Sequence, residues 1–127
     1  MVKQYLSLAE MISGTSEGNK ALVELITADC DKIGASFIPW ESGSSAMTGG
    51  WKVALPIKPG KDYHWYVQDA DGLWTHKQGG MEVIDTVGYY YDSKGNMQYN
   101  STNLTDPETD AAKVGYSVFV GYYYIKY

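Results

Sequence analysis

The spacing of apolar residues changes once along this chain, near residue 50. Before that point, apolar residues recur three and four positions apart, as on one face of a helix. After it, short segments alternate apolar and polar residues, which is typical of strands with one buried face. We therefore predict helices over 3–13 and 17–30, then a glycine- and serine-rich loop over 37–50, then strands.

The strand-like part contains one clear hairpin. Residues 62–68 and 73–77 flank a turn-forming segment at 69–72, which makes the two arms antiparallel. The other expected elements are strands over 52–57, 81–91 and 115–126, a turn at 92–96 and a polar connection over 102–112. In the last strand one parity is occupied by Tyr116, Val118, Val120, Tyr122 and Tyr124. Helices that precede such a sheet predict an α+β fold, with the N-terminal helices packed on a mainly antiparallel sheet and the tyrosines on its other face.

The length of 127 residues suits one domain and is short for two. We expect a single domain over 1–127, in which 1–36 form the helical part and 51–127 the sheet part.

Charge and composition restrict the partners that this chain can take. The net charge is −5 and arginine is absent, so nucleic-acid phosphates should repel the chain. No apolar run is long enough to cross a bilayer, and no signal peptide is apparent. One cysteine, Cys30, agrees with a reducing compartment. We therefore expect a cytoplasmic protein that binds neither nucleic acid nor membrane.

Both histidines fall in the predicted hairpin, one on each arm. Histidine titrates near neutral pH, so His64 and His76 are the candidate catalytic residues if the protein is an enzyme. Whether they meet depends on the register of the two arms. A zinc site needs three or four ligands, and here two histidines have only nearby aspartates to complete one. We accordingly predict no metal and no cofactor.

Large aromatic residues surround the histidines and flank the 37–50 loop. They can form a wall that binds a planar ligand or a partner, or they can pack in the core as cross-strand pairs. The candidate binding residues are Trp40, Trp51, Tyr63, Trp65, Tyr66 and Trp74.

The thiol is poorly placed for nucleophilic catalysis. A reactive cysteine needs a lowered pKa, which the positive N-terminal end of a helix provides. Cys30 instead falls at the C-terminal end of its predicted helix, between Asp29 and Asp31. Both effects raise the thiol pKa, which favours a structural role.

A longer pattern extends over roughly residues 50–80. It consists of Lys52-Val53-Ala54-Leu55, Gly60-Lys61-Asp62-Tyr63-His64-Trp65-Tyr66, Asp69, Asp71-Gly72, Trp74, His76-Lys77 and Gly79. This pattern resembles a bacterial family with the signature YHWYRQDSDGxWSHKPG, which is similar to papain-like and NlpC/P60-like cysteine hydrolases. The resemblance implies that His64 stands at the position of the base and His76 at that of the second histidine.

The chain departs from that family at informative positions. Val67, Thr75 and Gln78 replace the arginine, serine and proline of the signature, and no upstream Asn-Cys-Tyr element supplies a nucleophile. The resemblance therefore implies a truncated papain-like or NlpC/P60-like domain that has kept the sheet and lost the thiol.

These observations favour a non-catalytic binding or inhibitor module, of the kind found among phage-encoded anti-defence proteins. Its aromatic and histidine hairpin would bind a protein or a small ligand. The alternative is a cysteine hydrolase, or another histidine-dependent enzyme, of papain-like ancestry. The residues do not indicate the oligomeric state.

Overall fold

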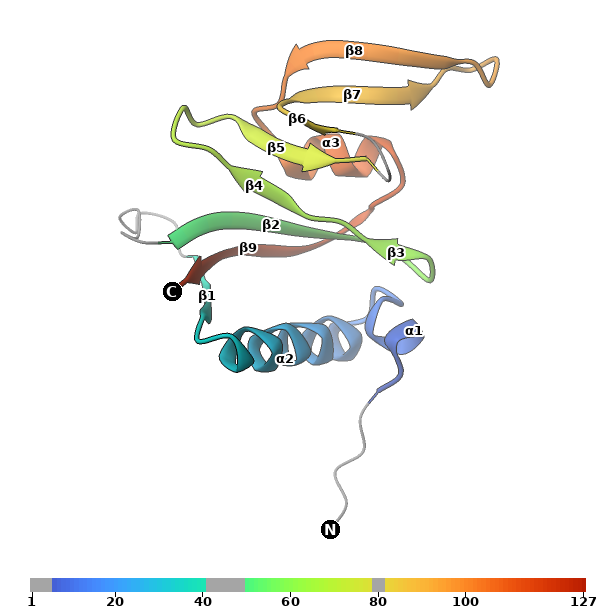
Figure 1. The fold of residues 1–127 in the computed structure, drawn as a ribbon. Helices are drawn as coiled ribbons and strands as arrows, with labels where there is room; N and C mark the ends of the chain where they lie inside the picture. The colour runs from blue at the N-terminus through green and yellow to red at the C-terminus, as the bar shows by residue number, and fades with distance from the viewer. Residues whose placement is uncertain (1–5, 41–49, 79–81) are drawn as a thin grey trace.

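The computed structural model describes residues 6–40, 50–78 and 82–127, which form an α+β fold (Figure 1). The helices are α1 (Leu8–Met11), α2 (Ser16–Lys32) and α3 (Pro107–Lys113). The strands are β1 (Ser36–Pro39), β2 (Gly50–Lys58), β3 (Asp62–Tyr63), β4 (Tyr66–Gln68), β5 (Trp74–Lys77), β6 (Val83–Ile84), β7 (Thr86–Tyr91), β8 (Met97–Asn103) and β9 (Val118–Lys126).

The main sheet is antiparallel throughout its described strands. Its order is β1-β9-β2-β4-β5-β6, with β3 also paired to β2. The long strands β2 and β9 lie side by side in its middle, and β7 pairs with β8 in a separate hairpin. In Figure 1, α2 runs along β2 and β9, whereas α3 and the β7–β8 hairpin lie toward the β5 and β6 end. None of the described helices has the length and apolarity that a membrane crossing requires.

Helices α1 and α2 cover one face of the sheet. Helix α2 begins because Thr15 accepts a hydrogen bond from the Gly18 backbone N–H at 3.0 Å, which makes Thr15 its N-terminal cap. Its apolar side buries Leu22 against Leu55 and other β2 residues. The second predicted helix is thereby confirmed, whereas α1 is a single turn within the predicted 3–13 range.

The opposite face of the sheet is covered by α3, which the sequence reading assigned to a polar connection over 102–112. Asp106 caps this helix, and Pro107 occupies its first turn, where a missing N–H costs nothing. Ala111 of α3 and Leu104 pack here against Ala54 of β2. The prediction was wrong because the polar composition outweighed the Asp-Pro start signal.

A bulge in β9 breaks the predicted single parity of its tyrosines and valines. Leu55 pairs with Gly121 but Pro56 pairs with Phe119, so Val120 is an extra residue in the strand. Consequently Val118 and Val120 face the helices α1 and α2, whereas Tyr122 lies on the α3 face. One inserted residue thus changes which face the following side chains occupy.

Two further strands lie where loop was expected. Residues 36–39 form β1, which pairs with β9, so the loop prediction fails over 37–39, and its 41–49 part lies outside the described residues. Strand β8 is exposed along most of its length, so it lacks the apolar alternation that would have predicted it.

Candidate functional site: a tyrosine-lined cavity with a histidine pair

The predicted hairpin is confirmed in part: its second arm carries His76 on β5, but the first arm is broken, because β3 pairs with β2 and His64 lies between β3 and β4. Strands β4 and β5 pair antiparallel, with Tyr66 opposite His76. The turn between them is closed by a hydrogen bond from the Asp69 backbone N–H to the Leu73 carbonyl, and Gly72 adopts a φ of +86° that suits glycine. Because successive side chains alternate, Tyr63 and Trp65 face the helices, while His64 and Tyr66 face the other side.

The two histidines are in direct contact. His64 Nε2 lies 3.2 Å from His76 Nδ1, and His76 Nε2 lies 3.0 Å from the Thr86 carbonyl oxygen. A carbonyl can only accept, so His76 Nε2 carries a proton and donates it. When both rings are neutral, His76 Nδ1 accepts from His64 Nε2–H. His64 Nδ1 then has a lone pair and no proton, which makes it a hydrogen-bond acceptor.

His64 is neutral at physiological pH. Burial and then the neighbouring His76 lower its pKa, the Asp62 carboxylate opposes them, and the net pKa is about 4. A neutral imidazole agrees with the acceptor role of Nδ1.

Tyr66 connects the histidine pair to helix α3. Its side chain is only 1% exposed, and its ring stacks on His76 with centroids 4.8 Å apart. Its hydroxyl donates a 2.7 Å hydrogen bond to Asp110 Oδ2. Burial, followed by the interaction with Asp110, raises the pKa of Tyr66. Tyr66 therefore remains a neutral donor to the carboxylate.

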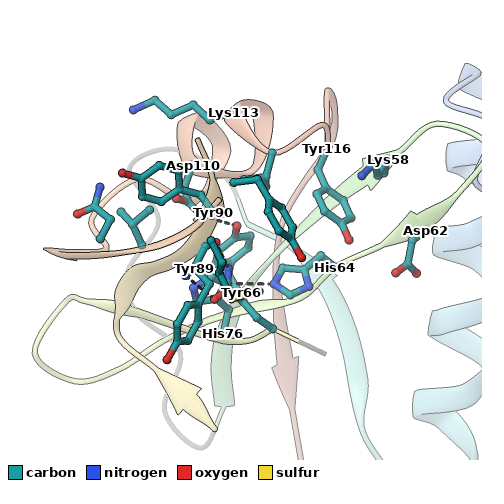
Figure 2. A pocket seen from close by; sticks show the side chains of 16 residues that line it. Lys58, Asp62, His64, Tyr66, His76, Tyr89, Tyr90, Asp110, Lys113 and Tyr116 are labelled. Atoms are coloured by element: carbon teal, nitrogen blue, oxygen red, sulfur yellow. Dashed lines mark hydrogen bonds between the residues drawn. The ribbon is translucent and has the colours of Figure 1, made fainter. Parts of the chain in front are cut away.

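These groups line a cavity of about 760 Å³ between the sheet, α3 and the β7–β8 hairpin, which we call the tyrosine cavity (Figure 2). This volume lies within the range of roughly 300–1,000 Å³ that is usual for ligand sites. Its lining residues are Lys58, Asp62, His64, Tyr66, His76, Gln78, Val87, Tyr89, Tyr90, Tyr91, Met97, Asn100, Asp110, Lys113, Val114 and Tyr116.

Gln78 fixes the β7–β8 hairpin over the cavity. Its side-chain amide donates to the Tyr89 carbonyl at 3.0 Å and accepts from the Tyr89 backbone N–H at 2.9 Å. Gly88 allows this close approach, because a Cβ atom there would lie 2.5 Å from Gln78 Oε1. The residue that departs from the proline of the signature therefore holds one wall of the cavity.

The aromatic residues expected to form one wall lie on different parts of the molecule. Tyr63 and Trp65 pack beneath the helices, and Trp74 is 3% exposed within the α3-side core. Trp40 lies over the Lys52 ammonium, 3.6 Å from ring centroid to Nζ, and Trp51 lies against Tyr127. Of the six predicted binding residues, Tyr66 alone lines the tyrosine cavity.

Cys30 lies on the opposite face of the sheet from the histidines. It is buried in the last turn of α2 against Phe37 and Tyr123, and it does not line the tyrosine cavity. Burial, together with the Asp29 and Asp31 carboxylates, raises the pKa of its thiol, as the sequence predicts. The described residues do not bring this sulfur to the histidine pair.

Several lining residues were missed by the sequence reading. The Asp106-Pro107 pair is a helix start signal, and a helix predicted there would have one buried face on which Asp110 could have been expected. Tyr116 and the tyrosines of β7 carried no local signal, because only tertiary structure brings them to the histidines. Within the described ranges, no group of three or more histidine, cysteine or acidic side chains is arranged to hold a metal ion.

Comparison with known proteins gives one informative similarity. The chain is 39% identical over 70 residues to Insoluble matrix shell protein 1 of Ruditapes philippinarum. The match covers 55% of this chain and 39% of that protein, so the chain spans well under half of its relative. No family model and no solved structure matches. A relationship to papain-like or NlpC/P60-like hydrolases therefore stays a prediction.

Proposed function

We propose that this chain is a non-catalytic binding module whose ligand site is the tyrosine cavity. The observation that carries the proposal is the composition of its lining: tyrosines and the histidine pair, with His64 neutral, surround a ligand-sized space, and no described cysteine, serine or threonine side chain lines it. Such a site can stack on a ligand and accept hydrogen bonds, but its described lining has no serine, threonine or cysteine to act as a nucleophile.

The occupant is a small molecule or a side chain of a protein partner. An inhibitor role, including that of a phage-encoded anti-defence protein, is a form of the same proposal, since inhibitors act by occupying a partner. The name of the Ruditapes philippinarum relative describes a matrix protein, which also agrees with binding. A shell matrix lies outside the cell, whereas the sequence predicts a cytoplasmic location for this chain. The location therefore stays a prediction.

The proposal is tested by screening fragments of different charge against the isotope-labelled protein by NMR. We expect hits to perturb the signals of His64, Asn100 and Tyr116. Val114→Trp fills the cavity from a lining position and should abolish these shifts. Val83→Trp is the matched control, because Val83 is 64% exposed and does not line the cavity. Hits that survive Val114→Trp would place binding elsewhere, and an absence of cavity hits would refute the proposal.

The histidine hydrogen-bond chain favours a second candidate, a histidine-dependent enzyme. Thr86 and His76 orient His64 so that Nδ1 is an acceptor, which is the arrangement a general base requires. If Cys30 served as its nucleophile, a thiol probe would label it well below pH 8. We expect slow labelling that accelerates only near or above pH 8.5. Ser93→Cys in a Cys30→Ala background supplies an exposed reference thiol.

A further inference from the structure

Asp110 is a buried carboxylate in the first turn of α3, with no cationic side chain beside it among the described residues. It is 7% exposed, and it borders the tyrosine cavity. Tyr66 is the one hydrogen-bond donor that the described residues direct to its side chain. No described lysine or histidine nitrogen lies within 4.0 Å of it. Buried carboxylates are usually paired with a cation, because desolvating a lone charge is costly.

The same cavity offers a second acceptor. When both rings are neutral, His64 Nδ1 has no proton, and the described residues provide no donor to it. The Tyr66 hydroxyl already donates to Asp110, and His76 Nε2 already donates to the Thr86 carbonyl, so neither group can donate to a ligand. The buried groups of the cavity therefore favour a ligand that brings hydrogen-bond donors.

Aromatic faces in this protein already attract ammonium groups. Lys58 Nζ lies 5.8 Å from the ring centroid of the cavity residue Tyr116, and Lys52 Nζ lies 3.6 Å from that of Trp40. Tyrosine faces stabilise such cations electrostatically. Tyr89 and Tyr90 also line the cavity, with each side chain 40% exposed, which leaves aromatic surface for a ligand.

We propose that the tyrosine cavity binds the primary ammonium group of an alkylamine, with the ammonium at Asp110 and the aliphatic stem between the tyrosines. This inference rests on the proposed binding function. The amine comes either from a lysine side chain of a protein partner or from a free amine. Lys58 and Lys113 also line the cavity, but Lys113 is exposed and Lys58 is only half-buried, so water screens both better than it screens Asp110.

The test compares two probes that differ only in the ammonium group. Nα-acetyl-lysine-methylamide represents a lysine side chain, and Nα-acetyl-norleucine-methylamide is its counterpart without the amine; cadaverine represents free amines. We expect the lysine probe to bind at least tenfold more tightly than the norleucine probe in NMR titrations. Stronger binding of cadaverine than of the lysine probe would identify a free amine as the occupant.

Asp110→Asn keeps the shape and the acceptor for Tyr66 but removes the charge, and it should abolish the preference for the lysine probe. Glu108→Gln, at an exposed carboxylate of the same helix that does not line the cavity, is the control and should change affinity by less than threefold. If Asp110→Asn fails to fold, Lys58→Gln still shows whether the cavity prefers a positively charged ligand. Removing that positive charge should strengthen amine binding, and weaker binding would overturn the inference.

The outcomes separate the two proposals. If neutral or anionic fragments occupy the cavity and amines do not, the amine inference fails and the binding function stands. If no probe of any charge perturbs the cavity residues, both fail.

Discussion

His64 and His76 occupy one hydrogen-bond chain but have different roles in it. His76 is 4% exposed and is held on both sides, by the Thr86 carbonyl and by His64. His64 is held on one side only, with its second nitrogen available to a ligand. A carbonyl at the end of the chain sets the direction of every donor in it. The backbone of β7 thereby determines what the cavity offers to its occupant.

The depressed pKa of His64 makes stability depend on pH. In the folded protein His64 protonates near pH 4, but in the unfolded chain near 6.5. Between these values the unfolded state binds more protons, so His64 stabilises the fold above pH 6.5 and this contribution decreases as the pH falls toward 4. We expect urea midpoints to fall less between pH 7 and pH 5 in His64→Gln than in the wild type.

His64→Gln also removes the ring that His76 contacts, so this comparison measures the histidine pair rather than His64 alone. Imidazole ¹⁵N shifts provide an independent check, because the chain has only two histidines. A His64 ring that titrates between pH 6 and pH 7 would contradict the arrangement described above.

At the scale of elements, the Gln78 side chain helps to hold the β7–β8 hairpin in place. Gln78 bonds both polar groups of the Tyr89 backbone, and Gly88 at φ +87° leaves the space for it. Gly88→Ala should therefore displace the Gln78 amide. Gly95 has a similar φ of +79° but no atom within 4 Å of an added Cβ, so Gly95→Ala incurs the backbone strain alone.

We expect Gly88→Ala to cost about 1–2 kcal/mol more than Gly95→Ala in urea unfolding, since two hydrogen bonds are weakened. Amide exchange at Tyr89 should accelerate in Gly88→Ala only. Combined with Gln78→Ala, the Gly88→Ala substitution should cost less than it does alone, because the amide is gone and an added Cβ then has to displace Ile84 Cδ1, at 2.5 Å, but no hydrogen-bonded group. Full additivity of the two substitutions would contradict a role for Gln78 in holding the hairpin.

The elements also differ in how far the sequence could predict them. Helix α2 and the β4–β5 hairpin follow from periodicity and turn residues, which are local signals. Strand β8 and the bulge at Val120 could not be predicted in this way, because exposure and register depend on neighbouring strands. For the same reason the meeting of His64 with His76 was left open, and Asp110 and Tyr116 were missed. The sequence located the two histidines and Tyr66, and tertiary packing brings the rest of the lining to them.

For the molecule as a whole, the central strands β2 and β9 contribute to cores on both faces of the sheet. Leu22 belongs to the helix-side core and is 1% exposed; Leu104 belongs to the α3-side core and is 2% exposed. Alternate residues of β2 point into each core, with Leu55 on one side and Ala54 on the other. Loss of either core should therefore destabilise the same pair of strands.

This arrangement predicts one cooperative unfolding transition, as expected for a single domain. Leu22→Ala and Leu104→Ala should each reduce the free energy of unfolding by about 2–5 kcal/mol, because each leaves a buried cavity. Since the two residues lie in separate cores, the double substitution should equal the sum within about 0.5 kcal/mol. Urea unfolding followed by far-UV circular dichroism and by tryptophan fluorescence measures both quantities. If Leu104→Ala instead produced two separate transitions, the α3 face with its tyrosine cavity would be an independent folding unit, and ligand binding there would stabilise only that unit.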